Sequence, residues 1–302
     1  MTSLVVGMGI GQLYKSVLTE LGHDVVTLDT DISKGADYTD IKKALDDYKH
    51  FTTVNICTPN FTHLSIARTV AKHADIVFIE KPGLETSKQW QHLCEEFPET
   101  RFMMVKNNQY RDNIDILTQL ASRASIINLS WVNNDRVPYP GTWFTTNDLA
   151  YGGVSRDLLP HLLSMFQTLS GFSHAEAKVI HKQCTQLWEL KDLTSTDYGL
   201  VKVNGIYNVD DSVEINFKDS KGRTWFLEAN WRCLCEDDRS ILMIFPDGTR
   251  YRYELGLCPE DAYKRMIKTA IEMSDVDAYW HHQYQLDMWI HEIIEDMEID
   301  KI

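Results

Sequence analysis

Short apolar runs alternate with amphipathic segments over the first hundred residues of the chain. The apolar runs predict five strands: Ser3–Val6, Val25–Asp29, Thr53–Cys57, Ile76–Ile79 and Phe102–Val105. The segments between them predict helices at Gln12–Leu21, Tyr38–Tyr48, His63–Lys72 and Ser87–Phe97. Strands this apolar need cover on both faces, and their alternation with helices predicts a doubly wound α/β parallel sheet.

The pattern changes near residue 107. A helix at Ile114–Ala121, a strand at Ile126–Val132 and a helix at Leu158–Leu169 are followed by runs of alternating polarity. These runs predict strands at Gly199–Val203, Ser212–Phe217, Thr224–Trp231, Ile241–Phe245 and Arg250–Leu255. Helices at Ala262–Met273 and Tyr279–Met297 close the chain. We therefore expect two domains, residues 1–107 and 108–302, the second of α+β class with a largely antiparallel open sheet.

The composition is that of a globular protein, with 43% hydrophobic and 25% charged residues among 302. The net charge of −14 disfavours nucleic acid and anionic membranes as partners. The N-terminus lacks the basic and small-residue features of a signal peptide. Six scattered cysteines, of which Cys233 and Cys235 are too close for a CxxC motif, predict reduced thiols in a cytoplasmic protein.

A glycine turn follows the first predicted strand. Gly7, Gly9 and Gly11 would allow a sharp turn and a close backbone approach to a pyrophosphate, with the next helix supplying N–H groups. Asp29 ends the second strand, where a carboxylate can accept hydrogen bonds from a ribose 2′-OH and would repel a 2′-phosphate. The expected cofactor is therefore NAD rather than NADP. The third glycine of the usual motif would fall at position 12, which is occupied by Gln12. The sequence therefore does not decide whether the helix packs closely on the strand at this point.

Lys81 lies just beyond the fourth predicted strand, and Pro82 follows it. Because ligands of open α/β sheets bind at the carboxyl ends of the strands, Lys81 and the segment Thr58-Pro59-Asn60 are expected beside the glycine turn. There the lysine could reach a substrate oxygen. A solvated lysine beside a loop proline is the alternative.

These motifs together resemble the glucose–fructose oxidoreductase / inositol dehydrogenase / MocA (Gfo/Idh/MocA) family. The resemblance is carried by Val5–Gly11, Cys57-Thr-Pro-Asn60, Glu80-Lys-Pro82 and Gly152-Gly-Val-Ser-Arg-Asp157-Leu-Leu-Pro-His161. It implies an N-terminal Rossmann domain, a C-terminal substrate-binding and oligomerisation domain, and catalysis on sugar or cyclitol alcohols by Lys81, Asp157 and His161. The usual glycine at position 159 and acid at position 164 are replaced by Leu159 and Ser164, which leaves the substrate open.

The four-residue spacing of Asp157 and His161 places both side chains on one helix face. Asp157 could then orient the imidazole, and His161 could accept a proton from a substrate hydroxyl. Pro160 lacks an N–H, which predicts a helix start near Ser155–Asp157. Asp157 as a mere helix cap and His161 as a packed polar residue are the alternative.

Further residues complete the expected site. The cofactor-binding set is Gly7, Gly9, Ile10, Gly11, Asp29, Thr58, Pro59, Asn60, His63, Glu80 and Lys81. The substrate-binding set is Lys81, Tyr110, Arg111, Trp143, Asp157 and His161. Arg111 could equally form a salt bridge between the domains. Trp143 could equally be a packing residue rather than a substrate-binding one. The last helix carries His281, His282, His291, Glu292 and Glu295, which lack a zinc motif and are expected at the surface or an interface, so no metal is expected.

The function these expectations favour is an NAD-dependent oxidoreductase acting on a CH–OH group of a sugar, a sugar derivative or a polyol. A redox-neutral enzyme that uses NAD transiently to cleave glycosides, and a non-catalytic nucleotide-sensing regulator, are the alternatives. A homodimer or homotetramer is expected through the exposed face of the second domain's sheet.

Overall fold

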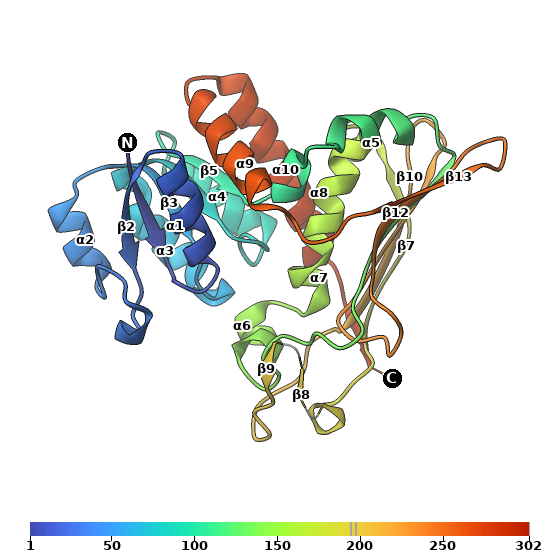
Figure 1. Cartoon of the computed structure of the whole chain (residues 1–302), viewed down its shortest axis with the longest axis horizontal. Coiled ribbons are helices and arrows are strands. Elements are labelled where there is room, and N and C mark those ends of the chain that lie inside the picture. Colours follow the sequence, from blue (N-terminus) through green and yellow to red (C-terminus); the bar gives the residue numbers. More distant parts are fainter. Residues whose placement is uncertain (194, 197, 302) are drawn as a thin grey trace. The chain divides into compact units, whose positions relative to one another are not determined.

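The computed structural model describes residues 1–193, 195–196 and 198–301. The chain divides into two compact units (Figure 1). Unit 1 comprises residues 1–110 and 259–292, and unit 2 comprises residues 111–258 and 293–302. This grouping differs from the expected domains 1–107 and 108–302, because the helices near the C-terminus are assigned to the first unit rather than the second.

Unit 1 contains a five-stranded parallel sheet, as expected, and each strand begins and ends within two residues of its predicted bounds. The strands are β1 (Thr2–Val6), β2 (Asp24–Leu28), β3 (Phe51–Ile56), β4 (Ala74–Ile79) and β5 (Arg101–Met104). The helices between them are α1 (Gly11–Glu20), α2 (Ile41–Asp47), α3 (His63–Val70) and α4 (Ser87–Glu96). Nearly every residue in the second half of each strand is buried, because helices cover both faces of the sheet.

The spatial strand order is β2-β1-β3-β4-β5. The direction in which strands are added therefore reverses at β1, so β1 and β3 form the topological switch point at which open α/β sheets bind ligands. Right-handed crossovers on either side of this point place α1 on one face and α3 and α4 on the other. The contacts agree, since α1 packs against α9 (Glu260–Glu272) and α3 packs against α4.

A buried ion pair ties the long helix α10 (Asp277–Glu295) to β5. Lys106 and Asp287 are both fully buried and form a salt bridge. Asp287 also accepts a hydrogen bond from the Met104 N–H at 3.0 Å, and Lys106 donates one to the Met104 carbonyl at 3.2 Å. Burial lowers the pKa of Lys106, and burial raises the pKa of Asp287 to about 6. The part of α10 up to residue 292 is thus fixed to the sheet edge by polar contacts that hydropathy alone does not reveal.

Unit 2 is built on a seven-stranded mixed sheet of order β13-β12-β6-β11-β10-β7-β14. Its strands are β6 (Ile126–Val132), β7 (Lys178–Gln186), β10 (Ser212–Lys218), β11 (Thr224–Asn230), β12 (Asp238–Ile244), β13 (Arg250–Glu254) and β14 (Ile299–Lys301). Four neighbouring pairs are antiparallel, whereas β6–β11 and β7–β14 are parallel. The expected α+β class and largely antiparallel sheet are confirmed.

One face of this sheet forms the core of unit 2. Alternate residues of β6, β10 and β11 are buried, and α7 (Val154–Asp157) and α8 (Leu159–Leu169) pack against these strands, with α5 (Ile114–Ala121) against α8. Phe166 stacks on Phe217 with ring centres 4.6 Å apart, which joins α8 to β10. The helix α6 (Asn147–Ala150) lies in the connection between β6 and α7.

Two strand predictions in unit 2 are wrong. The sequence pattern missed β7, whose first six residues are all exposed, so it has no apolar alternation to detect. The predicted strand Gly199–Val203 is instead the two-residue strand β9 (Gly199–Leu200), which pairs with β8 (Ser195–Thr196) in a separate small sheet. Within the described residues, no helix is long and apolar enough to cross a membrane.

Candidate active site

The glycine turn lies at the carboxyl end of β1 and contacts the segment that follows β3. Gly7 has φ +92°, and a Cβ atom on it would lie 2.6 Å from the Cys57 carbonyl oxygen. Only glycine allows this close approach. Gly9 is exposed, and no described atom lies within 4 Å of a Cβ built there. The turn therefore brings bare backbone to the switch point, as binding of a pyrophosphate requires.

Gly11 resolves the question raised by Gln12. It is the first residue of α1, and a Cβ on it would lie 2.9 Å from Val5 Cγ1. Gly11 thus permits the close packing of helix on strand that the third glycine of the motif usually provides. Ile10 precedes the helix and is half exposed.

Asp29 is bonded to the glycine turn. Its Oδ2 accepts a hydrogen bond from the Met8 N–H at 2.7 Å, and its Oδ1 accepts one from the Asp31 N–H at 2.9 Å. The carboxylate therefore lies beside the turn at the carboxyl end of β2, in the position expected of a ribose-binding acid.

His63 connects the two motif loops that follow β3 and β4. The ring is fully buried, with Nδ1 2.7 Å from the Gly83 carbonyl oxygen and Nε2 2.8 Å from the Thr58 carbonyl oxygen. Burial lowers the pKa of His63, and the positive charge of Lys81 lowers it further. His63 thus holds Thr58-Pro59-Asn60 against the loop that carries Lys81, and its expected contact with the cofactor stays a prediction.

Glu80 and Lys81 have different environments although they are adjacent. Glu80 is buried, and its Oε1 accepts a hydrogen bond from the hydroxyl of Tyr14 on α1 at 2.6 Å. Lys81 is half-buried, and its bond to Pro82 is cis. Glu80 thus fixes the end of β4, and Lys81 is the more accessible of the two at the same sheet edge.

His291 supports the same loop from α10. It is 0% exposed, its Nδ1 donates to the Asp287 carbonyl at 2.7 Å, and its Nε2 accepts from the Leu84 N–H at 3.0 Å. Its ring lies against Trp90 with centres 5.0 Å apart. The expectation that His291 is a surface or interface residue is therefore wrong: a neutral imidazole satisfies two backbone groups here. Among the described residues, no group of three or more His, Cys, Asp or Glu side chains could hold a metal ion.

Asp157 and His161 are distinguished in unit 2 by their exposure. In the segment 152–170, which includes α7 and α8, only Asp157 and His161 are partly exposed, and all the remaining residues are buried. Pro160 lies in the first turn of α8, as expected, but that helix begins at Leu159, and Asp157 is the last residue of α7 rather than a helix cap. The carboxylate and the imidazole are thus the two groups that this segment presents at its surface.

Two tryptophans of the sheet hold this pair. The indole Nε1 of Trp231 donates a hydrogen bond to Asp157 Oδ2 at 2.8 Å. The ring of Trp131 stacks on His161 with centres 5.3 Å apart and planes 21° apart. Neither tryptophan was expected in the site, since sequence alone does not distinguish them from other core aromatic residues on alternating strands.

A buried aspartate positions the start of α7. Asp210 accepts hydrogen bonds from the Gly153 N–H, the Ser155 N–H and the Ser155 hydroxyl at 2.7 to 2.9 Å. A Cβ on Gly153 would lie 1.8 Å from the Asp210 carbonyl oxygen. Gly153 is therefore needed so that the start of α7 can approach Asp210, and Asp210 is a third residue of the site that the sequence did not reveal.

The remaining expected substrate residues have contacts of their own. The Tyr110 hydroxyl lies 3.1 Å from that of Tyr279 in unit 1, and burial raises the pKa of Tyr110. Arg111 is buried and donates hydrogen bonds to the Leu255 and Gly256 carbonyls in unit 2. Trp143 is half-buried and stacks on Phe144 with ring centres 3.9 Å apart. The roles of Tyr110, Arg111 and Trp143 in substrate binding stay predictions.

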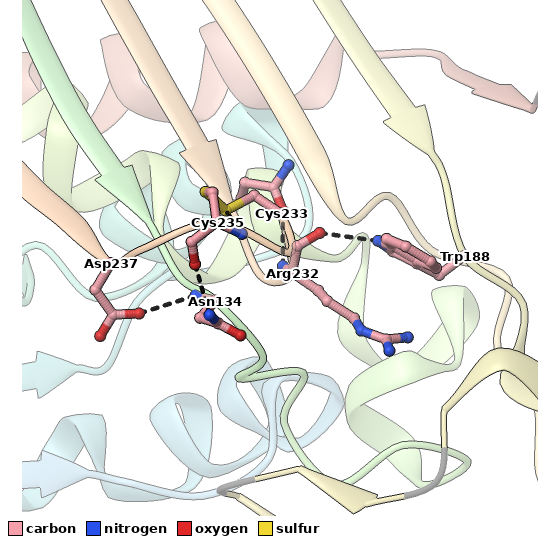
Figure 2. The surroundings of a disulfide bond; sticks show 7 residues. Asn134, Trp188, Arg232, Cys233, Cys235 and Asp237 are labelled. Atoms are coloured by element: carbon pink, nitrogen blue, oxygen red, sulfur yellow. Dashed lines mark hydrogen bonds between the residues drawn. A yellow bond between two sulfur atoms is a disulfide. The ribbon is translucent and has the colours of Figure 1, made fainter.

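The turn after Trp231 contains a disulfide between Cys233 and Cys235 (Figure 2). The expectation of six reduced thiols is therefore wrong for this pair: Leu234 adopts a left-handed conformation with φ 56°, which brings the two sulfurs together. The turn is fixed by Asn134, whose side chain donates to the Cys235 carbonyl at 2.6 Å and whose N–H donates to Asp237 at 2.8 Å (Figure 2).

Comparisons with known proteins agree with this fold. Residues 23–107 match the model of the oxidoreductase family with an NAD-binding Rossmann fold, GFO_IDH_MocA. A stretch of 120 residues is 28% identical to a putative UDP-kanosamine synthase oxidoreductase subunit of Amycolatopsis mediterranei (strain S699), covering 38% of this chain and 34% of that relative. The chain thus spans about a third of the length of the curated relative that it matches.

Two solved structures share the fold over nearly the whole chain. GenD2 from gentamicin A biosynthesis, solved in complex with NAD, aligns with a TM-score of 0.75 at 17% identity, covering 98% of this chain and 93% of GenD2. Levoglucosan dehydrogenase in complex with NADH and levoglucosan aligns with a TM-score of 0.72 at 14% identity, covering 98% and 96%. The resemblance predicted from the motifs is confirmed to this extent: residues 23–107 match the model of the Gfo/Idh/MocA oxidoreductase family with its NAD-binding Rossmann fold.

Proposed function

We propose that the protein is an NAD-dependent oxidoreductase that transfers hydride between the nicotinamide and a hydroxyl or carbonyl group of a sugar, a sugar derivative or a polyol. The observation that carries this proposal is the selective exposure of Asp157 and His161 in an otherwise buried segment. Buried tryptophans fix both side chains, which is the preorganisation that a catalytic acid–base pair requires.

The residues of unit 1 fit an NAD molecule. The Gly7 turn presents backbone without side-chain obstruction, and Asp29 places a carboxylate beside it. A carboxylate there accepts from a ribose hydroxyl and repels a 2′-phosphate, which favours NAD over NADP. NAD, when bound, accepts or donates the hydride at C4 of its nicotinamide, and the protein contributes binding, orientation and proton transfer.

Three side chains divide the proton chemistry in this proposal. His161 removes the proton from the substrate hydroxyl, while Asp157 stabilises the resulting imidazolium. Lys81 donates a hydrogen bond to the same oxygen as the carbonyl forms, and so stabilises the negative charge that develops there. Support for Lys81 comes from its place at the carboxyl edge of β4, in a loop held by His63 and His291.

The test is turnover of a panel of sugars, sugar derivatives and polyols with NAD⁺, followed by NADH absorbance and by chromatography of the products. The proposal predicts NADH formation with at least one member and loss of that activity in His161→Asn. His92→Asn, at an exposed histidine of α4, is the matched control and should retain activity. NADH formation that is unchanged in His161→Asn would contradict the assignment. Product formation without net NADH would favour the redox-neutral alternative.

We also propose a homodimer or homotetramer assembled through the exposed face of the unit 2 sheet. This face carries apolar side chains beside polar ones, with Ile180 56% exposed and Phe226 39% exposed. Light scattering at micromolar concentration should give a mass of two or four chains, and a monomer would contradict the proposal.

A further inference from the structure

Arg239 and the proposed catalytic residue His161 both contact the indole ring of Trp131. It is on β12, directly opposite Trp131 of β6 in the antiparallel register. Its guanidinium carbon is 5.5 Å from the centre of the Trp131 ring, on which His161 also stacks. Any ligand bound by Arg239 would therefore be close to the ring that fixes His161.

The positive charge of Arg239 lacks a dedicated counter-ion. One terminal nitrogen donates to Asn133 Oδ1 at 3.0 Å, and Nε is buried without a hydrogen-bond partner. Within the described part of the chain, no carboxylate forms an ion pair with it. Burial lowers the pKa of Arg239, as does the positive charge of Arg136, while Asp237 acts in the opposite direction.

The neighbouring carboxylates are each paired with another arginine. Asp237 binds Arg136 at 2.7 Å and also accepts the Asn134 N–H (Figure 2). Glu254 binds Arg252 at 2.6 Å. Among the charged side chains of this cluster, Arg239 is therefore the cation without a carboxylate of its own. A guanidinium that is partly desolvated and unpaired is costly, and an anion supplied by a ligand removes that cost.

A cavity of about 670 Å³ opens on this cluster. It is lined by Arg136, Arg239, Asp237, Glu254, Tyr198 and Leu257. This volume lies in the range that holds small-molecule ligands, and all of these residues belong to unit 2. The guanidinium of Arg239, which has no carboxylate partner among the described side chains, thus lines a space large enough for a substituted sugar.

We propose that Arg239, assisted by Arg136, forms an oxyanion subsite that binds a carboxylate or phosphate group carried by the substrate. The planar guanidinium presents parallel N–H donors that match either oxyanion. The inference rests on the proposed function, since it places the anionic group on the carbohydrate that is oxidised. It narrows the substrate class from sugars in general to acidic sugars, namely uronic acids or sugar phosphates.

Calorimetry on the full chain saturated with NADH, which cannot take up a hydride from the probe, tests the subsite with D-glucuronate, D-glucose 6-phosphate and D-glucose as probes. At least one anionic probe should bind about tenfold or more tightly than glucose, a difference of about 1.4 kcal/mol, because its hydrogen bonds to the guanidinium are charge-assisted. The tighter of the two anionic probes identifies carboxylate or phosphate as the preferred group.

The variants assign this preference to Arg239. The tighter binding of the anionic probe relative to glucose should disappear in Arg239→Gln and be partly kept in Arg239→Lys. The control Arg250→Gln, at an exposed arginine of β13, should leave this difference unchanged. The proposal is overturned if neither anionic probe binds more tightly than glucose, or if Arg239→Gln keeps the preference. Binding is measured without turnover, so anion binding with no NADH from any substrate would reject the proposed function and leave the subsite standing.

Discussion

The imidazole Nε2 of His291 accepts a hydrogen bond from the backbone N–H of Leu84, three residues after Lys81. On the other side of the same loop, His63 contacts the Gly83 carbonyl oxygen. Two buried histidines, one at the start of α3 and one near the end of α10, thus fix the backbone that carries the proposed catalytic lysine. A rigid support of this kind is what a catalytic side chain requires.

Replacing His291 by Ala should impair both stability and turnover. The Leu84 N–H would be left buried without a partner, which costs about 1–3 kcal/mol, and the contact with Trp90 would be lost. Leu93→Ala, in the buried face of α4, is a control of comparable destabilisation that leaves the loop contacts intact. Turnover measured at saturating substrate should fall in His291→Ala well below that of Leu93→Ala. Equal turnover in the two variants would reject a positioning role.

The Lys81→Ala variant should lose turnover and keep NAD binding. Removing a donor to a developing oxyanion lowers kcat by about 10² to 10³-fold, whereas the cofactor contacts of the glycine turn remain. Lys88→Ala, at an exposed lysine of α4, controls for the loss of a positive charge. Steady-state kinetics together with NAD titration separate the two effects. If NAD affinity falls as steeply as kcat, Lys81 acts in cofactor binding rather than in chemistry.

Replacing one member of the Lys106–Asp287 pair should lower the free energy of unfolding more than replacing both members. Asp287→Leu leaves a buried ammonium without its partner, and we expect a loss of about 3–5 kcal/mol in the free energy of unfolding. The double variant Lys106→Met with Asp287→Leu should recover a large part of this loss, because no buried charge remains. Urea unfolding of the wild type, both single variants and the double variant measures the difference. A double variant no more stable than Asp287→Leu would contradict this account.

The stability of unit 2 should depend on pH through Asp211. Burial raises the pKa of Asp211 to about 6, against 3.8 for an ordinary aspartate. The folded state therefore binds this proton more tightly than the unfolded state does, and the free energy of unfolding should fall by roughly 2–3 kcal/mol as the pH rises from about 4 to about 6. Urea unfolding across this range should show a flatter profile for Asp211→Asn. Asp148→Asn, at an exposed aspartate of α6, should keep the wild-type slope, and a slope unchanged in Asp211→Asn would contradict the assignment.

The predictable part of the fold is the part whose signal is local. The strands of the parallel sheet were found to within two residues because each is an apolar run ended by polar residues. The motifs at Gly7, Lys81 and Asp157 were recognised because glycine turns and strand ends have fixed sequence signatures. The helix at Leu158–Leu169 was placed within one residue of α8, whereas the short helix α7 before it was not predicted as a separate element. The start of α7 is held by hydrogen bonds to Asp210, which is far away in the sequence.

The residues that support the site were not predictable from local pattern. His291 sits on a helix with other histidines, and only the fold shows that it is buried against Leu84. Trp131 and Trp231 read as core residues of alternating strands, and their contacts with His161 and Asp157 arise from the packing of α7 and α8 on the sheet. The Cys233–Cys235 disulfide depends on the left-handed conformation of Leu234, which composition does not specify.

The central claim is that Lys81 and His161 act on one and the same substrate oxygen. A double-mutant cycle on kcat/KM tests it most directly, using Lys81→Ala, His161→Asn and the double variant with the best substrate of the panel. Residues that act together in one step are strongly non-additive, so the double variant should lose little more activity than the worse of the two single variants. A loss in the double variant equal to the product of the two single losses would show that the residues act independently, and would contradict the claim.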